Sequence, residues 1–168
     1  NDLLLHPYVR PVGKSENLFW ATYLKNTHPS HYNYQRYLPG EIEVSGGIVL
    51  AMVVGIAGRE FRQILLQQID SAFHVSPVFA EDRIGAFSFV REVRHLMPGF
   101  EEISIRTFGV RNMDTEPELE NVAFPKSLFD DSVVQPANIR EIIEEKCPVL
   151  NDKVCSVINW SVLRKVDG

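Results

Sequence analysis

The sequence has little cysteine and no long hydrophobic run. Its two cysteines, Cys147 and Cys155, have no CxxC pattern and no histidine at metal-binding spacing beside them. We therefore expect buried, reduced thiols of an intracellular protein. The longest apolar stretch, residues 48–58, is far shorter than the roughly 20 residues of a membrane-spanning helix. No basic, apolar leader is present, so we expect any targeting signal to lie outside this sequence.

Catalytic sequence motifs are also missing. There is no GxSxG, phosphate loop, HExxH or close Cys/His pair, and the glycines of residues 45–47 lack nucleotide-loop spacing. The adjacent acids at 81–82 and 130–131 are typical of solvated turns. His28 and His31 could form a metal pair, but no third ligand lies near them. The sequence thus predicts a protein that is not an enzyme and needs no cofactor or metal.

Excess negative charge is confined to one segment. Residues 1–58 carry four basic and four acidic side chains, residues 59–111 carry seven of each, and residues 132–168 carry five of each. Residues 112–131 contain one lysine and six acids, which accounts for the net charge of −5. The rest of the chain is balanced, so composition alone does not exclude a nucleic-acid partner.

Lysine is absent between residues 37 and 125, where every basic side chain is arginine. The planar guanidinium makes bidentate hydrogen bonds to phosphate and stacks on bases, which favours a nucleic-acid-binding surface. The alternative is that these arginines pair with glutamates on neighbouring strands, namely Glu60, Glu92, Glu101 and Glu102. The arginines are Arg59, Arg62, Arg83, Arg91, Arg94, Arg106 and Arg111.

The apolar pattern predicts a mainly β fold with flanking helices. A short helix is expected over residues 18–24, where apolar side chains recur at helical spacing. Glycines inside the first apolar run suggest the bulges that small closed barrels need, and Pro98-Gly99 predicts a hairpin turn. The expected strands are residues 42–57, 61–69, 73–80, 84–95 and 101–111.

Two C-terminal helices are predicted after the acidic linker. Pro136 begins the first, which ends before Pro148, and Asn151-Asp152 provides a good N-cap for a second that runs to Lys165. The second helix is apolar on more than one side, which favours a partner. Its expected partner-interface residues are Val154, Val157, Ile158, Trp160 and Val162.

Phenylalanine and arginine share strand faces in the predicted barrel. Period-two alternation places Phe89 with Arg91, and Arg106 with Phe108. Such a face could hold single-stranded DNA by base stacking and phosphate contacts. For Phe87 and Phe89, however, we favour packing beneath the C-terminal helices.

Three segments give the chain a resemblance to a known family. The segments are Leu5-His6-Pro7 with residues 17–26, residues 44–55 with Ile69-Asp70-Ser71, and residues 102–112 with Leu128-Phe129-Asp130. Together they resemble the OB-fold subunit shared by the replication protein A middle subunit and the Stn subunit of the CST telomere-capping complex. The turn at Ile69-Asp70-Ser71 has one aspartate where the family has two. The connection after residue 80 is too short for the helix that the family often has there. These departures suit a divergent, fly-type member.

The resemblance implies a five-stranded OB-fold Greek-key barrel plus a C-terminal α-helix. One OB-fold domain would span residues 1–168, with a lead-in (1–40), barrel strands (41–111), an acidic linker (112–135) and C-terminal helices (136–168). The implied function is non-catalytic binding of single-stranded DNA in the nucleus, at chromosome ends. The implied partner is a small Ten-like OB-fold subunit such as Modigliani, bound through the C-terminal helix. The candidate nucleic-acid-binding residues are Arg59, Arg62, Phe73, His74, Arg94, Arg106 and Arg111. The alternative is an OB-fold interaction scaffold that does not bind DNA.

Overall fold

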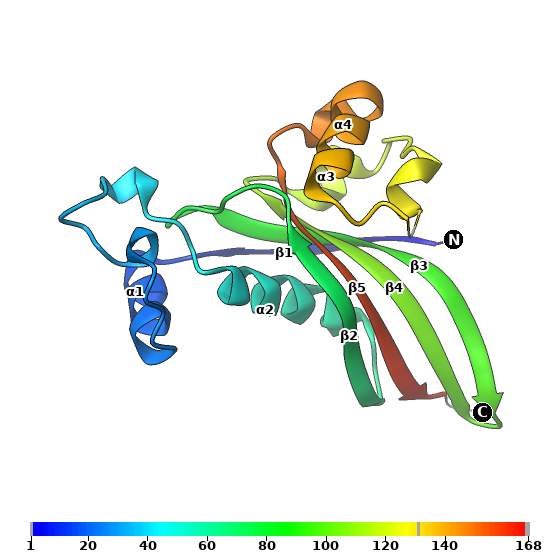
Figure 1. Ribbon diagram of the computed structural model, residues 1–168. Coiled ribbons are helices and arrows are strands. Elements are labelled where there is room, and N and C mark those ends of the chain that lie inside the picture. Colours follow the sequence, from blue (N-terminus) through cyan, green and yellow to red (C-terminus); the bar gives the residue numbers. More distant parts are fainter. Residues whose placement is uncertain (1, 131, 167–168) are drawn as a thin grey trace.

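Five antiparallel strands form one open, curved sheet in the computed structural model, which describes residues 2–130 and 132–166 (Figure 1). The strand order is β1-β3-β4-β5-β2, and β1 and β2 are the edges. The predicted closed OB-fold barrel is therefore wrong, because no pairing between the described residues of the two edge strands closes the sheet. The strands are β1 (Leu3–Pro11), β2 (Ile64–His74), β3 (Arg83–Met97), β4 (Phe100–Arg111) and β5 (Val154–Lys165).

Helices cover both faces of the sheet. Figure 1 shows α2 against one face and the segment that contains α3 and α4 against the other. None of the described helices is long and apolar enough to cross a membrane. The α-helices are α1 (Lys14–Tyr23), α2 (Gly46–Ala57), α3 (Thr115–Leu119) and α4 (Pro136–Lys146). Single 3-10 turns are η1 (Pro29–His31), η2 (Pro39–Glu41), η3 (Gly58–Glu60), η4 (Lys126–Phe129) and η5 (Pro148–Leu150).

The central helix α2 replaces the long first strand that the sequence predicted. Its buried side chains recur at helical spacing and pack on the sheet together with Ile105, Trp160 and Val162. Gly109 of β4 permits this close approach, because a Cβ there would lie 2.5 Å from Val53 of α2. A short apolar run of this kind fits a buried strand or a buried helix equally well.

The predicted C-terminal helix is strand β5. This strand lies between β4 and β2, and both of its faces are covered. Val157 packs on the α4 side, whereas Ile158, Trp160 and Val162 pack on the α2 side. Residues 167–168 of the predicted helical segment lie outside the described residues, as does Asp131 of the predicted acidic pair.

The outer face of the sheet is covered by the long segment between β4 and β5. Phe87 and Phe89 are buried there with residues of α4, which confirms that they pack beneath the C-terminal segment. The Arg106 guanidinium is fully buried and donates hydrogen bonds to the carbonyl oxygens of Asp130 and Val133, at 2.9 and 2.6 Å. Arg106 therefore anchors this segment to the sheet.

Other predicted elements are confirmed within a few residues. The helix expected over 18–24 belongs to α1, and the one expected from Pro136 is α4. The two strands expected over 84–95 and 101–111 are β3 and β4. The expected break at 70–72 is wrong, because β2 continues to His74 with only a register shift between Ile69 and Ser71.

Candidate active site

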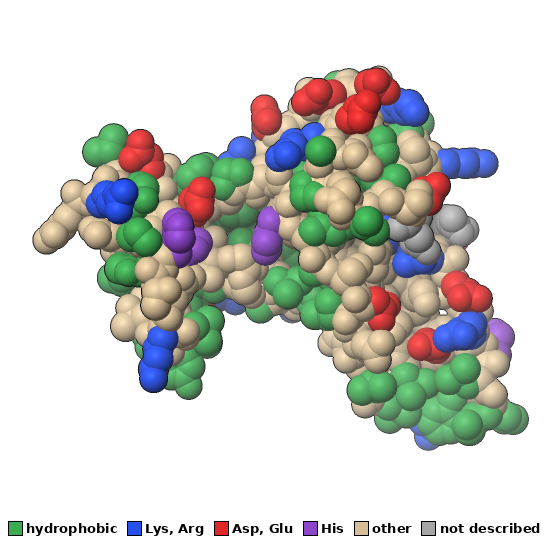
Figure 2. All heavy atoms as spheres, in the orientation of Figure 1, with side chains coloured by type: hydrophobic (Ala, Val, Ile, Leu, Met, Phe, Trp, Pro, Cys, Tyr) green, Lys and Arg blue, Asp and Glu red, His purple; other side chains and the backbone are tan. Residues whose placement is uncertain are grey.

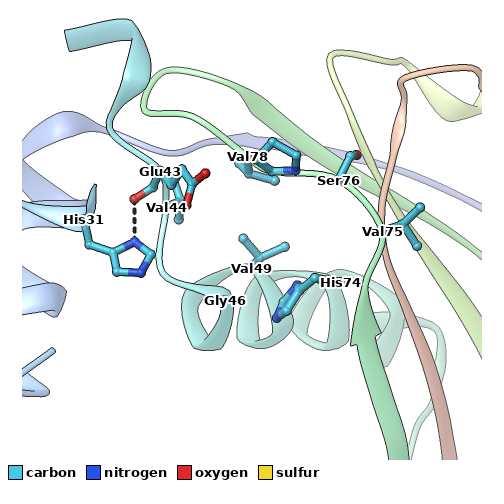
Figure 3. Close-up of a pocket in the computed structure, with 10 residues that line it drawn as sticks. His31, Glu43, Val44, Gly46, Val49, His74, Val75, Ser76 and Val78 are labelled. Carbon is cyan, nitrogen blue, oxygen red and sulfur yellow. Dashed lines mark hydrogen bonds between the residues drawn. The ribbon is translucent and has the colours of Figure 1, made fainter. Parts of the chain in front are cut away.

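A pocket of ≈ 390 Å³ opens beside the N-terminal turn of α2. Its walls come from the segment that precedes α2, from the end of β2 and from the loop after β2 (Figure 3). Valines supply apolar walls, and the polar groups that line it are those of His31, Glu43, His74 and Ser76.

Asn17 of α1 holds the segment before α2 in place. The side chain of Asn17 is fully buried, and its amide nitrogen lies 3.2 Å from the His31 carbonyl oxygen and 3.4 Å from that of Glu43. Its amide oxygen accepts a hydrogen bond from the Ser45 N–H at 3.4 Å. One side chain thus fixes three points around the pocket, including the residue that precedes α2.

The protonation of the half-buried His31 ring is set by a backbone contact. Its Nδ1 lies 2.9 Å from the Glu43 carbonyl oxygen, and the dashed line in Figure 3 marks this bond. A carbonyl oxygen only accepts hydrogen bonds, so Nδ1 carries the proton. In the neutral ring, Nε2 is then left with a free lone pair, as a general base requires.

His74, the last residue of β2, lies directly against the first residue of α2. A Cβ built on Gly46 would be 2.3 Å from His74 Nε2, so the ring fills the space that a side chain would need. Although the residue is exposed overall, the partial burial of its ring lowers the pKa of His74. Figure 3 places His74 and His31 on opposite sides of this turn.

The N-terminus of α2 adds hydrogen-bond donors to the pocket. The first intrahelical bond runs from the Ile48 N–H to the Ser45 carbonyl oxygen at 2.9 Å, so the N–H groups of Gly46 and Gly47 precede the helical ladder. The helix dipole gives this end a partial positive charge. An oxygen that gains negative charge during a reaction is stabilised by such a site.

The arrangement is suited to removing a proton from the carbon atom next to a carbonyl group. A neutral imidazole can take the proton, while the helix terminus polarises the carbonyl oxygen. Both groups belong to this chain and open on the same pocket. In the part of the chain that the structure describes, no group of three or more His, Cys, Asp or Glu side chains could hold a metal ion.

The predicted nucleic-acid residues do not form one surface, and only His74 among them lines the pocket. Arg94 pairs with Glu102, its neighbour on the next strand, in agreement with the ion-pair alternative. Arg111 lies 3.7 Å from Asp82. The remaining predicted residues have four different surroundings. Arg59 lies over the Tyr8 ring, and Arg62 is exposed just before β2. Phe73 packs against the core on the outer face of the sheet, and Arg106 is buried.

The predicted partner-interface residues are buried within the chain. Val154, Val157, Ile158, Trp160 and Val162 are at most 2% exposed, and all belong to β5 rather than to a docking helix. The main functional candidate that sequence reasoning missed is His31, which the sequence pattern suggested only as a metal ligand. The available signal was its position in a turn-rich segment shortly before a Gly-Gly pair and a long apolar run.

Comparison with known proteins gave matches among solved structures only. No protein-family model matches the chain, and no curated protein matches it. A MaoC domain dehydratase from Chloroflexus aurantiacus is 16% identical with a TM-score of 0.70, over 99% of this chain and 43% of that protein. This chain thus spans less than half of the Chloroflexus protein.

Two further solved structures match over nearly their whole length. The HadBC (3R-hydroxyacyl-ACP dehydratase) complex of Mycobacterium tuberculosis is 14% identical with a TM-score of 0.58, over 96% of this chain and 94% of that one. The (R)-hydratase of A. caviae, involved in PHA biosynthesis, is 14% identical with a TM-score of 0.53, over 94% and 90%.

These likenesses correct the interpretation drawn from the sequence. They contradict the resemblance to replication protein A and Stn, and with it the telomeric single-stranded DNA function and the Ten-like partner. The expectation of a non-catalytic protein is contradicted as well, since the matched structures are named as dehydratases and a hydratase. The nuclear location stays an untested prediction. What the likenesses show is the fold: an open antiparallel sheet curved around one central helix, which is a hotdog fold.

Proposed function

We propose that this protein is a hydro-lyase that interconverts a 3-hydroxyacyl thioester and the corresponding 2-enoyl thioester plus water. The observation that carries the proposal is the His31 ring, whose proton is held on Nδ1 beside the N-terminal turn of α2. The names of two solved structures with this fold support the substrate class, since one is a 3R-hydroxyacyl-ACP dehydratase and the other an (R)-hydratase.

The reaction follows from the two features of the pocket. The thioester carbonyl oxygen accepts hydrogen bonds from the N–H groups at the start of α2, which makes the C2 proton more acidic. His31 Nε2 takes that proton, the C2–H electron pair forms the C2=C3 double bond, and the C3–O bond breaks toward oxygen. The hydroxyl leaves as water after gaining one proton. Hydration is the same sequence reversed.

A turnover assay with the whole chain tests this proposal. We expect the wild-type protein to consume trans-2-enoyl thioesters of coenzyme A, measured by the loss of the conjugated enoyl absorbance. Substrates of four to ten carbons should be compared, because the valine-lined pocket is small. Absence of turnover with every thioester, at protein concentrations where the chain is folded by circular dichroism, would contradict the proposal.

We also propose that β2 pairs with β2 of a second copy. As an edge strand it has unpaired backbone groups, and Leu65 and Leu66 are more than half exposed. Figure 2 shows hydrophobic side chains gathered at the end of the sheet where β2 and β4 begin and β3 ends. Antiparallel pairing centred on Leu66 would bring Arg62, which lies just before β2, near Asp70 of the second copy, and this gives matched charges across a two-fold axis.

Sedimentation analysis of three variants tests this pairing. We expect the wild type to be a dimer and Asp70→Arg to be a monomer, because like charges then face each other. The exchanged double variant, Arg62→Asp with Asp70→Arg, should restore the dimer. Val149→Glu, on the outer-face segment, is the control. A wild-type monomer, or a dimer in every variant, would contradict the pairing.

A further inference from the structure

The position of His74 is too specific for an incidental surface histidine. Its ring occupies the side-chain space of Gly46 at the start of α2, where the proposed function places the substrate carbonyl. It belongs to β2 and pairs with Ser156 of β5, so the sheet and not a loop fixes its backbone. His31 reaches the same pocket from the segment before α2 (Figure 3).

The proposed reaction needs two proton transfers, at two different atoms of the substrate. His31 accounts for the transfer at C2, which leaves the oxygen at C3 without a proton donor or acceptor. An imidazole whose Nδ1 is hydrogen-bonded to a backbone carbonyl has only Nε2 available for proton transfer. A second acid–base group that lines the same pocket would complete the reaction.

We propose that His74 is this second catalytic residue, and that it exchanges a proton with the oxygen at C3. This inference rests on the proposed function. In hydration, neutral His74 takes a proton from water while the water oxygen forms the C3–O bond, the C2=C3 electron pair moves to C2, and C2 gains the proton held by His31. In dehydration, protonated His74 gives its proton to the C3 hydroxyl, which leaves as water, and His31 takes the C2 proton.

The electrostatic surroundings of His74 agree with this role in hydration. Partial burial lowers the pKa of His74 below its ordinary value of 6.5, so the ring is neutral near pH 7 and able to accept a proton from water. The other titratable groups that line the pocket are His31 and Glu43. Hydration should therefore lose activity as the pH falls through the His74 pKa, with this acidic limb below pH 6.5.

Kinetics of three variants test the assignment. We expect His74→Gln to lower kcat for hydration by about 10²–10⁴-fold with little change in KM, and to lose the acidic limb. Glu43→Gln should keep that limb. His95→Gln is the matched control, because the His95 side chain is 82% exposed at the far end of β3. An unchanged kcat in His74→Gln, or an increase in KM alone, would overturn the catalytic role of His74.

Binding measurements separate this inference from the proposed function. Nitrogen NMR of the imidazole rings, recorded with saturated butyryl coenzyme A, should show changes at both His31 and His74 but not at His95. Changes at His31 alone, in a wild-type protein that hydrates the enoyl thioester, would overturn the role of His74 and leave the proposed function standing. A wild-type protein without turnover and without any imidazole change would overturn both.

Discussion

Replacing His31 by glutamine is expected to lower kcat for hydration of a 2-enoyl thioester by about 10²–10⁴-fold. Glutamine keeps a donor that can reach the Glu43 carbonyl oxygen, now bonded to Nδ1 at 2.9 Å, but it cannot take up a proton. The backbone of the pocket should therefore keep its shape while the proton transfer at C2 is lost. KM should change little, because the substitution leaves the N-terminus of α2, the proposed site of the carbonyl oxygen, unchanged.

His28 offers a matched control three residues away. Its ring lies 5.8 Å from that of His31 between centroids and contacts the Ser30 hydroxyl at 2.7 Å, yet it does not line the pocket. We expect His28→Gln to retain a kcat close to that of the wild type. Equal losses in the two variants would indicate that the segment had merely shifted, and an active His31→Gln would remove His31 from the mechanism.

Replacing Trp160 by alanine should produce the largest loss of stability, about 3–5 kcal/mol. Trp160 is fully buried in the core beneath α2, and its ring packs edge-on against Phe61. Its Nε1 donates a hydrogen bond to Thr107 at 2.8 Å, and that hydroxyl contacts Ser88 at 2.7 Å. Alanine would leave both a cavity and a buried hydroxyl without its donor.

The other tryptophan and a conservative variant separate these contributions. Trp20→Ala should change the free energy of unfolding by much less, because Trp20 is 37% exposed on α1. Trp160→Phe keeps most of the ring volume and removes only the N–H donor, so we expect a loss of about 1–3 kcal/mol. The measurement is urea unfolding followed by circular dichroism. Similar losses for Trp160→Ala and Trp20→Ala would contradict the position of Trp160 in the core.

The sequence predicted the local elements better than their arrangement. The β3–β4 hairpin could be predicted because its turn is encoded locally, and Gly99 indeed adopts a φ of +80°. The identity of β5 could not, because alternate faces of a central strand covered on both sides are equally apolar. Val154, Ile158 and Val162 also fall at helical spacing, so these residues match the pattern of a helix although they form a strand.

The candidate site was missed for a related reason. Its chemistry depends on the N-terminus of α2. The sequence interpretation assigned residues 42–57 to a strand, and a strand has no such helix end. The sequence did not distinguish the two, because apolar residues fill the whole run. Only the structure shows which of them are buried on one helical face, namely Ile48, Val49, Met52, Val53 and Ile56. The meeting of His31 and His74 is a tertiary feature, because 43 positions separate them along the chain.

The most direct test of the proposed function is proton NMR of the product formed from trans-2-enoyl coenzyme A in D₂O. We expect a 3-hydroxyacyl thioester that carries one deuterium at C2, formed by the wild-type protein and, at matched protein concentration, almost absent with His31→Gln. No hydrated product from the folded wild-type chain, or the same product at the same rate from His31→Gln, would contradict the proposed function.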